Sequence, residues 1–340
     1  MSVLFSTITV KHLTFKNRVV MPPMVSVGLP ELADCAAVDG VVSEAGLEHY
    51  ARRARAGTGL IIVEATAVDE GGRCWKGGLC AYSDKHLPGL RRLAERIHAG
   101  GAAAGIQLVH GGPQGSPELA PDGLVGPSEV QPTESHPGVR ALTVEEIHRI
   151  EQFFEEAAAR AVEAGFDVVE VHGAHGFLLD SFVLAQRNRR TDEYGSSLGG
   201  RMRMLLETCR RVKQRISVRA LLDCRISIFN KREEGFSAGD LKQLVGGLED
   251  AGIDLLHIST DGAFKGYFGS ERTIGQWAKK MTDLPIIVAG GLGDPADAER
   301  AVAEGHADFA AVGTAMLKDP DWTRRAAEKL GVSSPSSPSL

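Results

Sequence analysis

The sequence has few cysteines, and none of them stands in a motif typical of a metal site or a disulfide framework. Its five cysteines include no C-x-x-C pair. Zinc knuckles, cysteine-ligated iron–sulfur clusters and disulfide-stapled folds all need closely or regularly spaced cysteines. We therefore expect reduced thiols and no bound metal.

The chain also lacks an excess of positive charge and a long apolar run. Its formal net charge is −6, which argues against a protein that binds the phosphate backbone of nucleic acids. No apolar run approaches the roughly 18 residues needed to cross a bilayer, and the N-terminal residues lack the apolar region of a signal peptide. These absences predict a cytoplasmic protein with neither a nucleic-acid nor a membrane partner.

Short β-branched runs alternate with segments of helical periodicity along nearly all of the chain. The runs predict eight strands, at 18–23, 59–65, 104–110, 166–173, 216–221, 254–260, 285–291 and 307–313. Helical patterns lie near 43–56, 83–99, 143–165, 200–214, 238–251, 271–280, 295–304 and 321–330. Such alternation is typical of parallel βαβ units, and no G-x-G-x-x-G follows the first strand. We predict an α/β fold, a (β/α)8 TIM barrel in one domain over 1–330, and a disordered Ser/Pro-rich tail over 331–340.

Two histidines, His172 and His175, stand three residues apart in "EVHGAHGFLLD", where a predicted strand ends. Zinc would need a third ligand, and usually the Glu of H-E-x-x-H, and the segment has neither. A structural pair whose hydrogen bonds are internal is a second interpretation. The third is a pair of N–H donors that grip one carbonyl oxygen as it gains negative charge.

Glycines follow the last two predicted strands, where TIM barrels commonly bind phosphate with backbone N–H groups. They are Gly290, Gly291 and Gly313, and Thr314 comes next. Arg219, at the end of the predicted fifth strand, would be costly to bury without an anionic partner. A phosphate ligand that carries an electron-accepting ring would account for the histidines, the glycines and the arginine. The long loop at 111–142 is either a lid over this end of the barrel or a surface excursion.

At this point the sequence resembles the old yellow enzyme family of flavin mononucleotide (FMN) ene-reductases. The resemblance rests on "KNRVVMPPM" (16–24), "GLEHYARRARAGTGLIIVEATAV" (46–68), "GIQLVHGG" (105–112), "AGFDVVEVHGAHGFLLDSF" (164–182), "RRTDEYGSSLGGRMRMLLE" (189–207) and "GTAMLKDP" (313–320). These segments span nearly the whole chain. The wording is most similar to the barrel domain of enoate reductases and bacterial NADH:flavin oxidoreductases.

The resemblance implies a role for each matching residue. Those implied to line the flavin ring are Pro23, Met24, Ala65 and Gln107, with Gln107 bonded to the pyrimidine edge. Arg219 would lie by flavin N1 and O2, and Gly290, Gly291, Gly313 and Thr314 would hold the phosphate. His172 and His175 would hold the carbonyl oxygen of an activated alkene, which agrees with the third interpretation above.

The chain departs from the family's pattern at four positions. Phe177 stands where a tyrosine usually protonates the α-carbon, so Tyr267 or a water must supply that proton. Val25 follows "MPPM" where Thr or Cys is usual, and with Phe177 it would face the substrate. Thr314 and Pro113 each replace a common arginine.

The resemblance implies an enzyme that reduces the C=C bond of an α,β-unsaturated carbonyl compound, with FMN as cofactor and NADPH or NADH as reductant. Because Phe177 has no proton to give, a flavin-dependent isomerase or dehydrogenase of a carbonyl compound is an alternative. A flavin-binding barrel without turnover is another, which Thr314 and Pro113 motivate. A homodimer is the default expectation for the assembly.

Overall fold

The computed structural model describes residues 2–228 and 235–332. Most of the predicted tail, 333–340, lies outside these residues. Within the described part, no helix is both long and apolar enough to cross a membrane.

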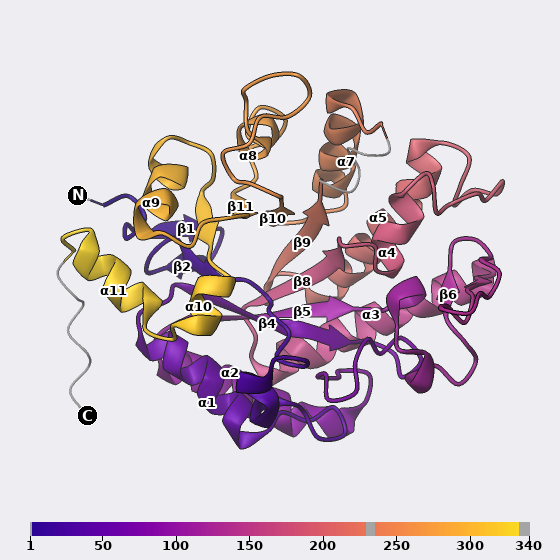
Figure 1. Cartoon of the computed structure of the whole chain (residues 1–340), viewed down its shortest axis with the longest axis horizontal. Coiled ribbons are helices and arrows are strands. Elements are labelled where there is room, and N and C mark those ends of the chain that lie inside the picture. The colour runs from indigo at the N-terminus through magenta and orange to yellow at the C-terminus, as the bar shows by residue number, and fades with distance from the viewer. Residues whose placement is uncertain (1, 229–234, 333–340) are drawn as a thin grey trace.

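Eight parallel strands close into a barrel, which confirms the predicted TIM barrel (Figure 1). In chain order they are β3 (Val19–Met21), β4 (Leu60–Ala67), β5 (Ala103–Val109), β8 (Val168–Gly173), β9 (Leu221–Ser227), β10 (Leu255–Ser259), β11 (Ile286–Ala289) and β12 (Phe309–Ala311). Each strand pairs with the next along the chain, and β12 returns to β3. All eight carboxyl ends therefore meet at one end of the barrel.

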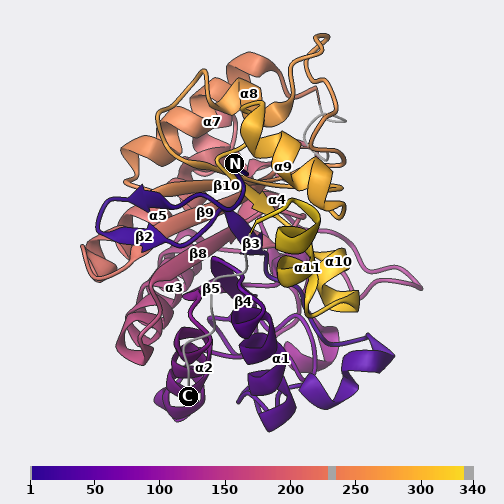
Figure 2. The same ribbon diagram turned by 90° about the vertical axis from the view of Figure 1, so that its left-hand side faces the viewer.

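Helices surround the strands in both views (Figures 1 and 2). The α-helices are α1 (Glu44–Arg55), α2 (Leu87–Ala99), α3 (Val144–Ala164), α4 (Leu178–Val183), α5 (Leu198–Ile216), α7 (Ala238–Asp250), α8 (Ile274–Ala278), α9 (Pro295–Ala303), α10 (Thr314–Lys318) and α11 (Trp322–Lys329). Short 3-10 turns are η1 (Pro30–Cys35), η2 (Asp84–His86), η3 (Gly112–Gln114) and η4 (Pro117–Leu119). Helix α3 begins at the Thr143–Glu146 capping box and ends at Gly165, whose φ is 98°.

A hairpin of β1 (Ile8–Val10) and β2 (Leu13–Phe15) covers the amino end of the barrel. Phe15 meets Phe309 of β12 edge to face, with ring centroids 5.1 Å apart. Val10 and Phe15 belong to one buried apolar cluster with side chains from seven of the barrel strands, and partly buried Ala103 of β5 packs against it. The amino end is thus a closed, packed core, and access is left to the carboxyl end.

The predicted fifth strand, 216–221, is wrong. Helix α5 continues to Ile216, Ser217 takes a left-handed φ of 54°, and the strand β9 begins only at Leu221. The segment "ISVRAL", which looks like a strand in the sequence, therefore contains the last residue of helix α5, a turn and the first residue of β9. The true strand, "LLDCRIS", contains Asp223 and Arg225, and these charges interrupt the apolar run that a buried strand is expected to show.

Residues 111–142 fold as an excursion with elements of their own. It holds η3, η4 and the paired two-residue strands β6 (Val125–Gly126) and β7 (Arg140–Ala141). Ala120, Leu124 and Val139 form a small apolar cluster inside it. In Figure 1 β6 lies at the edge of the molecule, beyond the carboxyl ends of β4 and β5.

Candidate active site

A cavity of about 590 Å³ opens at the carboxyl end of the barrel. Its walls include Met24, Gly290, Gly291, Gly313 and Thr314, all predicted from the sequence, and Ser259, which the sequence places at the end of a strand. Arg225 and Lys318 also line it and were not predicted. This volume is in the range typical of small-molecule and cofactor sites. Side chains and turns from β3, β9, β10, β11 and β12 thus converge where function is expected in a TIM barrel.

The glycines after β11 and β12 leave the backbone accessible from this cavity. A Cβ at Gly290 would lie 2.6 Å from Thr260 Cγ2, and one at Gly313 would lie 2.9 Å from Met24 Sδ. Gly291 has φ of +74°, a conformation that other residues rarely adopt. A side chain would be strained at Gly290 and at Gly291, and the peptide groups of these turns suit an oxyanion such as phosphate.

His172 and His175 lie together, as the sequence predicted. His172 is the penultimate residue of β8 and is 3% exposed, and its Nε2 lies 3.4 Å from His175 Nδ1. Burial holds the pKa of His172 well below its ordinary value, so its imidazole is neutral. The two facing nitrogens are close enough to share one acceptor oxygen.

The turn that carries His175 is held by polar contacts beneath it. His175 has φ of 61°, which is uncommon for a residue with a side chain. Its backbone N–H donates to Ser227 Oγ at 3.0 Å, and the N–H of Gly176 donates to Asp180 Oδ2 at 2.9 Å. Asp180 is fully buried at the start of α4, and Ser227 Oγ lies 3.5 Å from it. Both side chains thus position the histidine.

Ser259 links His175 to Arg225. The Arg225 guanidinium donates from Nη2 to Ser259 Oγ at 3.3 Å, and Ser259 Oγ lies 3.0 Å from His175 Nε2. Since the guanidinium has no acceptor, it donates to the serine oxygen, which keeps a second lone pair and its own hydroxyl hydrogen for the contact with the imidazole. Ser259 thus ties the ring of His175 to the buried guanidinium of Arg225.

An apolar patch adjoins His172. The ring of Phe177 lies 5.0 Å from that of His172 and meets Trp75 edge to face at 5.9 Å. Val25, Phe177 and Trp75 pack on a small cluster that contains Ala65, and the other members are Cys74 and Val109. The structure thus brings three predicted residues together, and it adds Trp75 from the loop after β4.

Arg225, and not Arg219, is the arginine of the barrel interior. Arg219 is exposed in the turn before β9, at the amino end of the barrel, and donates to the Arg215 carbonyl. Its prediction followed from the misplaced fifth strand, and it is wrong. Arg225 pairs in register with His172 of β8 and is 7% exposed. Its Nε has no hydrogen-bond partner among the described residues.

The remaining predicted residues are buried near the cavity. Gln107 points into the barrel, where its Nε2 donates to Glu170 Oε1 at 2.5 Å. Pro23 is buried beside Met24 in the turn after β3. The hydroxyl of Tyr267, 1% exposed, contacts Thr260 Oγ1 at 2.5 Å and donates to Asp261.

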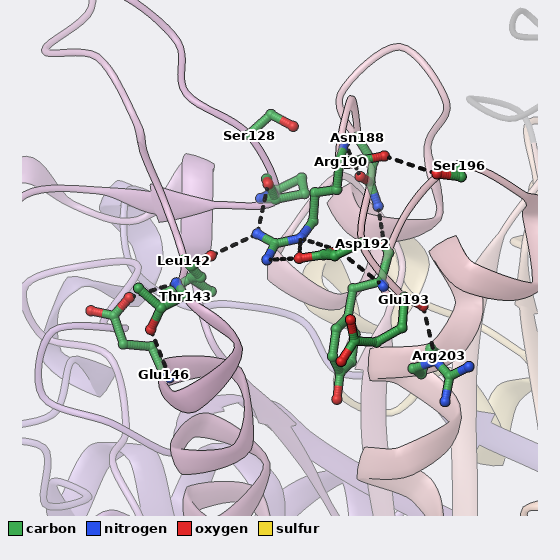
Figure 3. Close-up of polar contacts among 12 residues, drawn as sticks. Ser128, Leu142, Thr143, Glu146, Asn188, Arg190, Asp192, Glu193, Ser196 and Arg203 are labelled. Atoms are coloured by element: carbon green, nitrogen blue, oxygen red, sulfur yellow. Dashed lines mark hydrogen bonds and ion pairs between the residues drawn. The ribbon is translucent and has the colours of Figure 1, made fainter.

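The "RTDEYG" segment fastens the 111–142 excursion to the barrel (Figure 3). The Arg190 guanidinium donates to the carbonyls of Pro127 at 3.1 Å and Leu142 at 2.6 Å, and it pairs with Asp192. Asn188 donates to the Tyr194 carbonyl at 2.8 Å. These contacts give the segment a structural role outside the cavity.

Comparison with known proteins identifies the family. The model of the NADH:flavin oxidoreductase / NADH oxidase family matches residues 3–332. The chain belongs to this family. The NADPH dehydrogenase of Bacillus subtilis is 34% identical over 339 residues, which are 98% of this chain and 96% of that protein. The NADH oxidase of Thermoanaerobacter brockii is 37% identical over 342 residues, and this chain spans half of its length.

Solved structures agree with this assignment. The old yellow enzyme homologue from Zymomonas mobilis superimposes with a TM-score of 0.82 at 28% identity, over 97% of this chain and 94% of that one. Morphinone reductase in complex with tetrahydroNAD gives 0.82 and 28%, over 98% and 93%. The expectations of an old yellow enzyme relative, of an oxidoreductase and of FMN with NADPH or NADH as reductant are confirmed.

Proposed function

We propose that this protein reduces the C=C bond of an α,β-unsaturated carbonyl compound, with the carbonyl oxygen held between His172 and His175. The observation that carries the proposal is the 3.4 Å spacing of His172 Nε2 and His175 Nδ1 beside the cavity. Two N–H groups at that spacing stabilise negative charge as it develops on one oxygen.

The cavity residues fit FMN. The bare turns at Gly290, Gly291 and Gly313 suit its phosphate, and exposed Lys318 on the same wall offers a cation where Thr314 replaces an arginine. The buried Nε of Arg225, which has no partner in the described part of the chain, suits an acceptor on a flavin ring. Bound FMN supplies a hydride acceptor and donor.

The proton for the α-carbon has two candidate sources. Phe177 occupies the place beside His172 but has no acidic hydrogen. Tyr267 is one source, although its hydroxyl already contacts Thr260 and Asp261. Water is the other. A Tyr267→Phe variant with full turnover assigns the proton to water, whereas loss of turnover with normal FMN content assigns it to Tyr267.

A product assay tests the proposal. The FMN-loaded protein is incubated with NADPH and 2-cyclohexen-1-one, and the products are identified by mass spectrometry. We expect cyclohexanone in amounts equal to the NADPH consumed beyond an enone-free control. NADPH consumption without the saturated ketone would contradict the proposal.

A redox-neutral reaction is the second candidate, and Phe177 is the observation that favours it. If the α-carbon is not protonated in the site, isomerisation or dehydrogenation of a carbonyl compound is favoured over net reduction. Incubation of ketones and enones in heavy water without NADPH distinguishes the two. Deuterium exchange or isomer formation would support the second candidate. The absence of both would support reduction.

A further inference from the structure

The barrel interior holds a buried group of ionisable side chains below the cavity. Glu170 of β8, Asp223 of β9 and His257 of β10 are all 0% exposed. They lie two residues beyond Val168, Leu221 and Leu255, and so share the inward face of their strands. One ligand-type atom from each lies within 4.8 Å of the others.

Glu170 is the best-bonded member of this group. His257 Nδ1 lies 2.6 Å from its Oε2, and Gln107 Nε2 donates to its Oε1 at 2.5 Å. Burial lowers the pKa of His257, so a neutral imidazole donates its Nδ1–H to the carboxylate. Burial alone would raise the pKa of Glu170, but His257 and Arg225 hold it below its ordinary value.

Asp223 lies in the opposite situation. In the described part of the chain no hydrogen bond of ordinary geometry reaches its carboxyl oxygens, and its Oδ2 is 4.0 Å from His257 Nδ1. The carboxyl group of Glu170 is the neighbour to which a protonated Asp223 would donate. Burial and the neighbouring Glu170 raise its pKa well above the ordinary value. Two carboxylates so close in a dry site cannot both ionise cheaply.

One fixed cation faces this group. Arg225 lies two residues beyond Asp223 on β9, and its register neighbours are His172 and His257. Both of these imidazoles are neutral because burial lowers their pKa. The positive charge of Arg225 is therefore balanced, on the side away from the cavity, by the net negative charge of Glu170 and Asp223.

We propose that Glu170 and Asp223 hold one proton between them, on Asp223, so that one negative charge balances Arg225 and sets how strongly Arg225 favours reduced over oxidised FMN. The inference rests on the proposed function, because it concerns bound flavin. Glu170 and Asp223 are positioning residues, since they act on the flavin only through Arg225.

Two substitutions that preserve shape separate the two carboxyls. In Glu170→Gln the balancing charge is lost and Arg225 attracts the anionic reduced flavin more strongly. We expect at least a tenfold gain in preference for reduced FMN, which for a two-electron couple raises the midpoint potential by about 30 mV. Asp223→Asn replaces a neutral acid with a neutral amide, so we expect the potential to stay at the wild-type value.

The control is Glu151→Gln, which removes a carboxyl group that is buried equally deeply, on α3 outside the barrel. We expect no change of potential there. An Asp223→Asn variant whose potential rises as much as that of Glu170→Gln would overturn the proposal, because Asp223 would then be ionised. Equal potentials in wild type and Glu170→Gln would overturn it as well.

A second measurement needs neither flavin nor a folded Glu170 variant. Infrared spectroscopy of the flavin-free protein reports the carbonyl stretch of a buried protonated carboxyl group. We expect this band in the wild type and its loss in Asp223→Asn, and a band unchanged by the substitution would overturn the proposal. Failure to bind FMN would refute the proposed function but leave this result standing.

Discussion

The two halves of the barrel interior are built from different side chains. On β11, β12, β3 and the amino-terminal part of β4 the inward residues are apolar or small: Ile287, Ala289, Phe309, Ala311, Val20, Leu60 and Ile62. On β5, β8, β9 and β10 they include Gln107, Glu170, His172, Asp223, Arg225 and His257. The small side chains of the first half leave space for a ligand and leave the backbone accessible. The second half supplies hydrogen-bond donors and charged side chains.

This difference explains where the site's functions lie. Ala289 and Ala311 have the smallest side chains that still pack, and both line the cavity together with the glycines that follow their strands. The polar half can carry the buried charge of Glu170 because His257 and Gln107 donate hydrogen bonds to it. We infer that the small half holds the cofactor and that the polar half sets its reactivity.

The largest loss of activity is expected when a histidine of the His172–His175 pair is removed from the polar half. We expect His172→Ala to lower kcat for enone reduction roughly 100- to 1,000-fold, the effect of losing one oxyanion donor. FMN content should stay near that of the wild type, and steady-state kinetics with 2-cyclohexen-1-one measure the loss. His148→Ala, which changes a half-exposed histidine on α3, is the control. Wild-type kcat in His172→Ala would refute the role of the pair.

A substitution beside His172, in the same half, is expected to increase activity. Phe177→Tyr puts a hydroxyl beside His172, where a general acid for the α-carbon would stand. We expect kcat for enone reduction to rise on the order of 100-fold, the low end for a positioned acid. Phe153→Tyr on α3 is the control. An unchanged kcat would show that protonation does not limit the wild-type enzyme.

The two arginines test the corrected strand. Arg225→Ala removes charge-assisted hydrogen bonds worth about 1.5–3 kcal/mol, so we expect FMN to bind roughly ten- to hundredfold more weakly. Arg219→Ala removes an exposed side chain at the other end of the barrel and should leave the Kd unchanged. Fluorescence titration with FMN measures both. Weaker FMN binding in Arg219→Ala than in Arg225→Ala would support the strand predicted at 216–221.

The smallest effect is expected at Ser259, which touches the reacting oxygen only through His175. Loss of its hydrogen bond to Nε2 costs about 1 kcal/mol, so we expect kcat to fall about fivefold in Ser259→Ala. KM should change little, because the substrate does not contact the serine in this account. Ser270→Ala, on an exposed turn, is the control. A fall confined to KM would place Ser259 in direct contact with substrate.

Much of this comparison could be predicted from the sequence, and the misplaced strand and arginine share one cause. The glycine turns and the His172–His175 pair were predicted because each combines a pattern with a place at a strand's end. The strand β9 was missed because Asp223 and Arg225 interrupt its apolar run, and Arg219 was chosen in place of Arg225 as a consequence. Periodicity reports burial of apolar residues, and it fails where charges are buried in pairs.

Partners contributed by distant segments were also beyond the sequence. Ser259 reaches His175 across 84 residues, and Trp75 meets Phe177 from the loop after β4. Lys318 belongs to the motif that was quoted, but nothing in its spacing says that it lines the cavity. These contacts depend on how the barrel closes, which residue types alone do not specify.

Anaerobic stopped-flow spectroscopy of the FMN-loaded protein tests the central claim most directly. The protein is mixed first with NADPH and then with 2-cyclohexen-1-one, while the absorbance of the flavin is followed. In the wild-type protein, which has His172 and His175, we predict that NADPH bleaches the flavin absorbance and that the enone restores the oxidised spectrum. Bleaching without recovery would contradict the claim that this pair activates an unsaturated carbonyl.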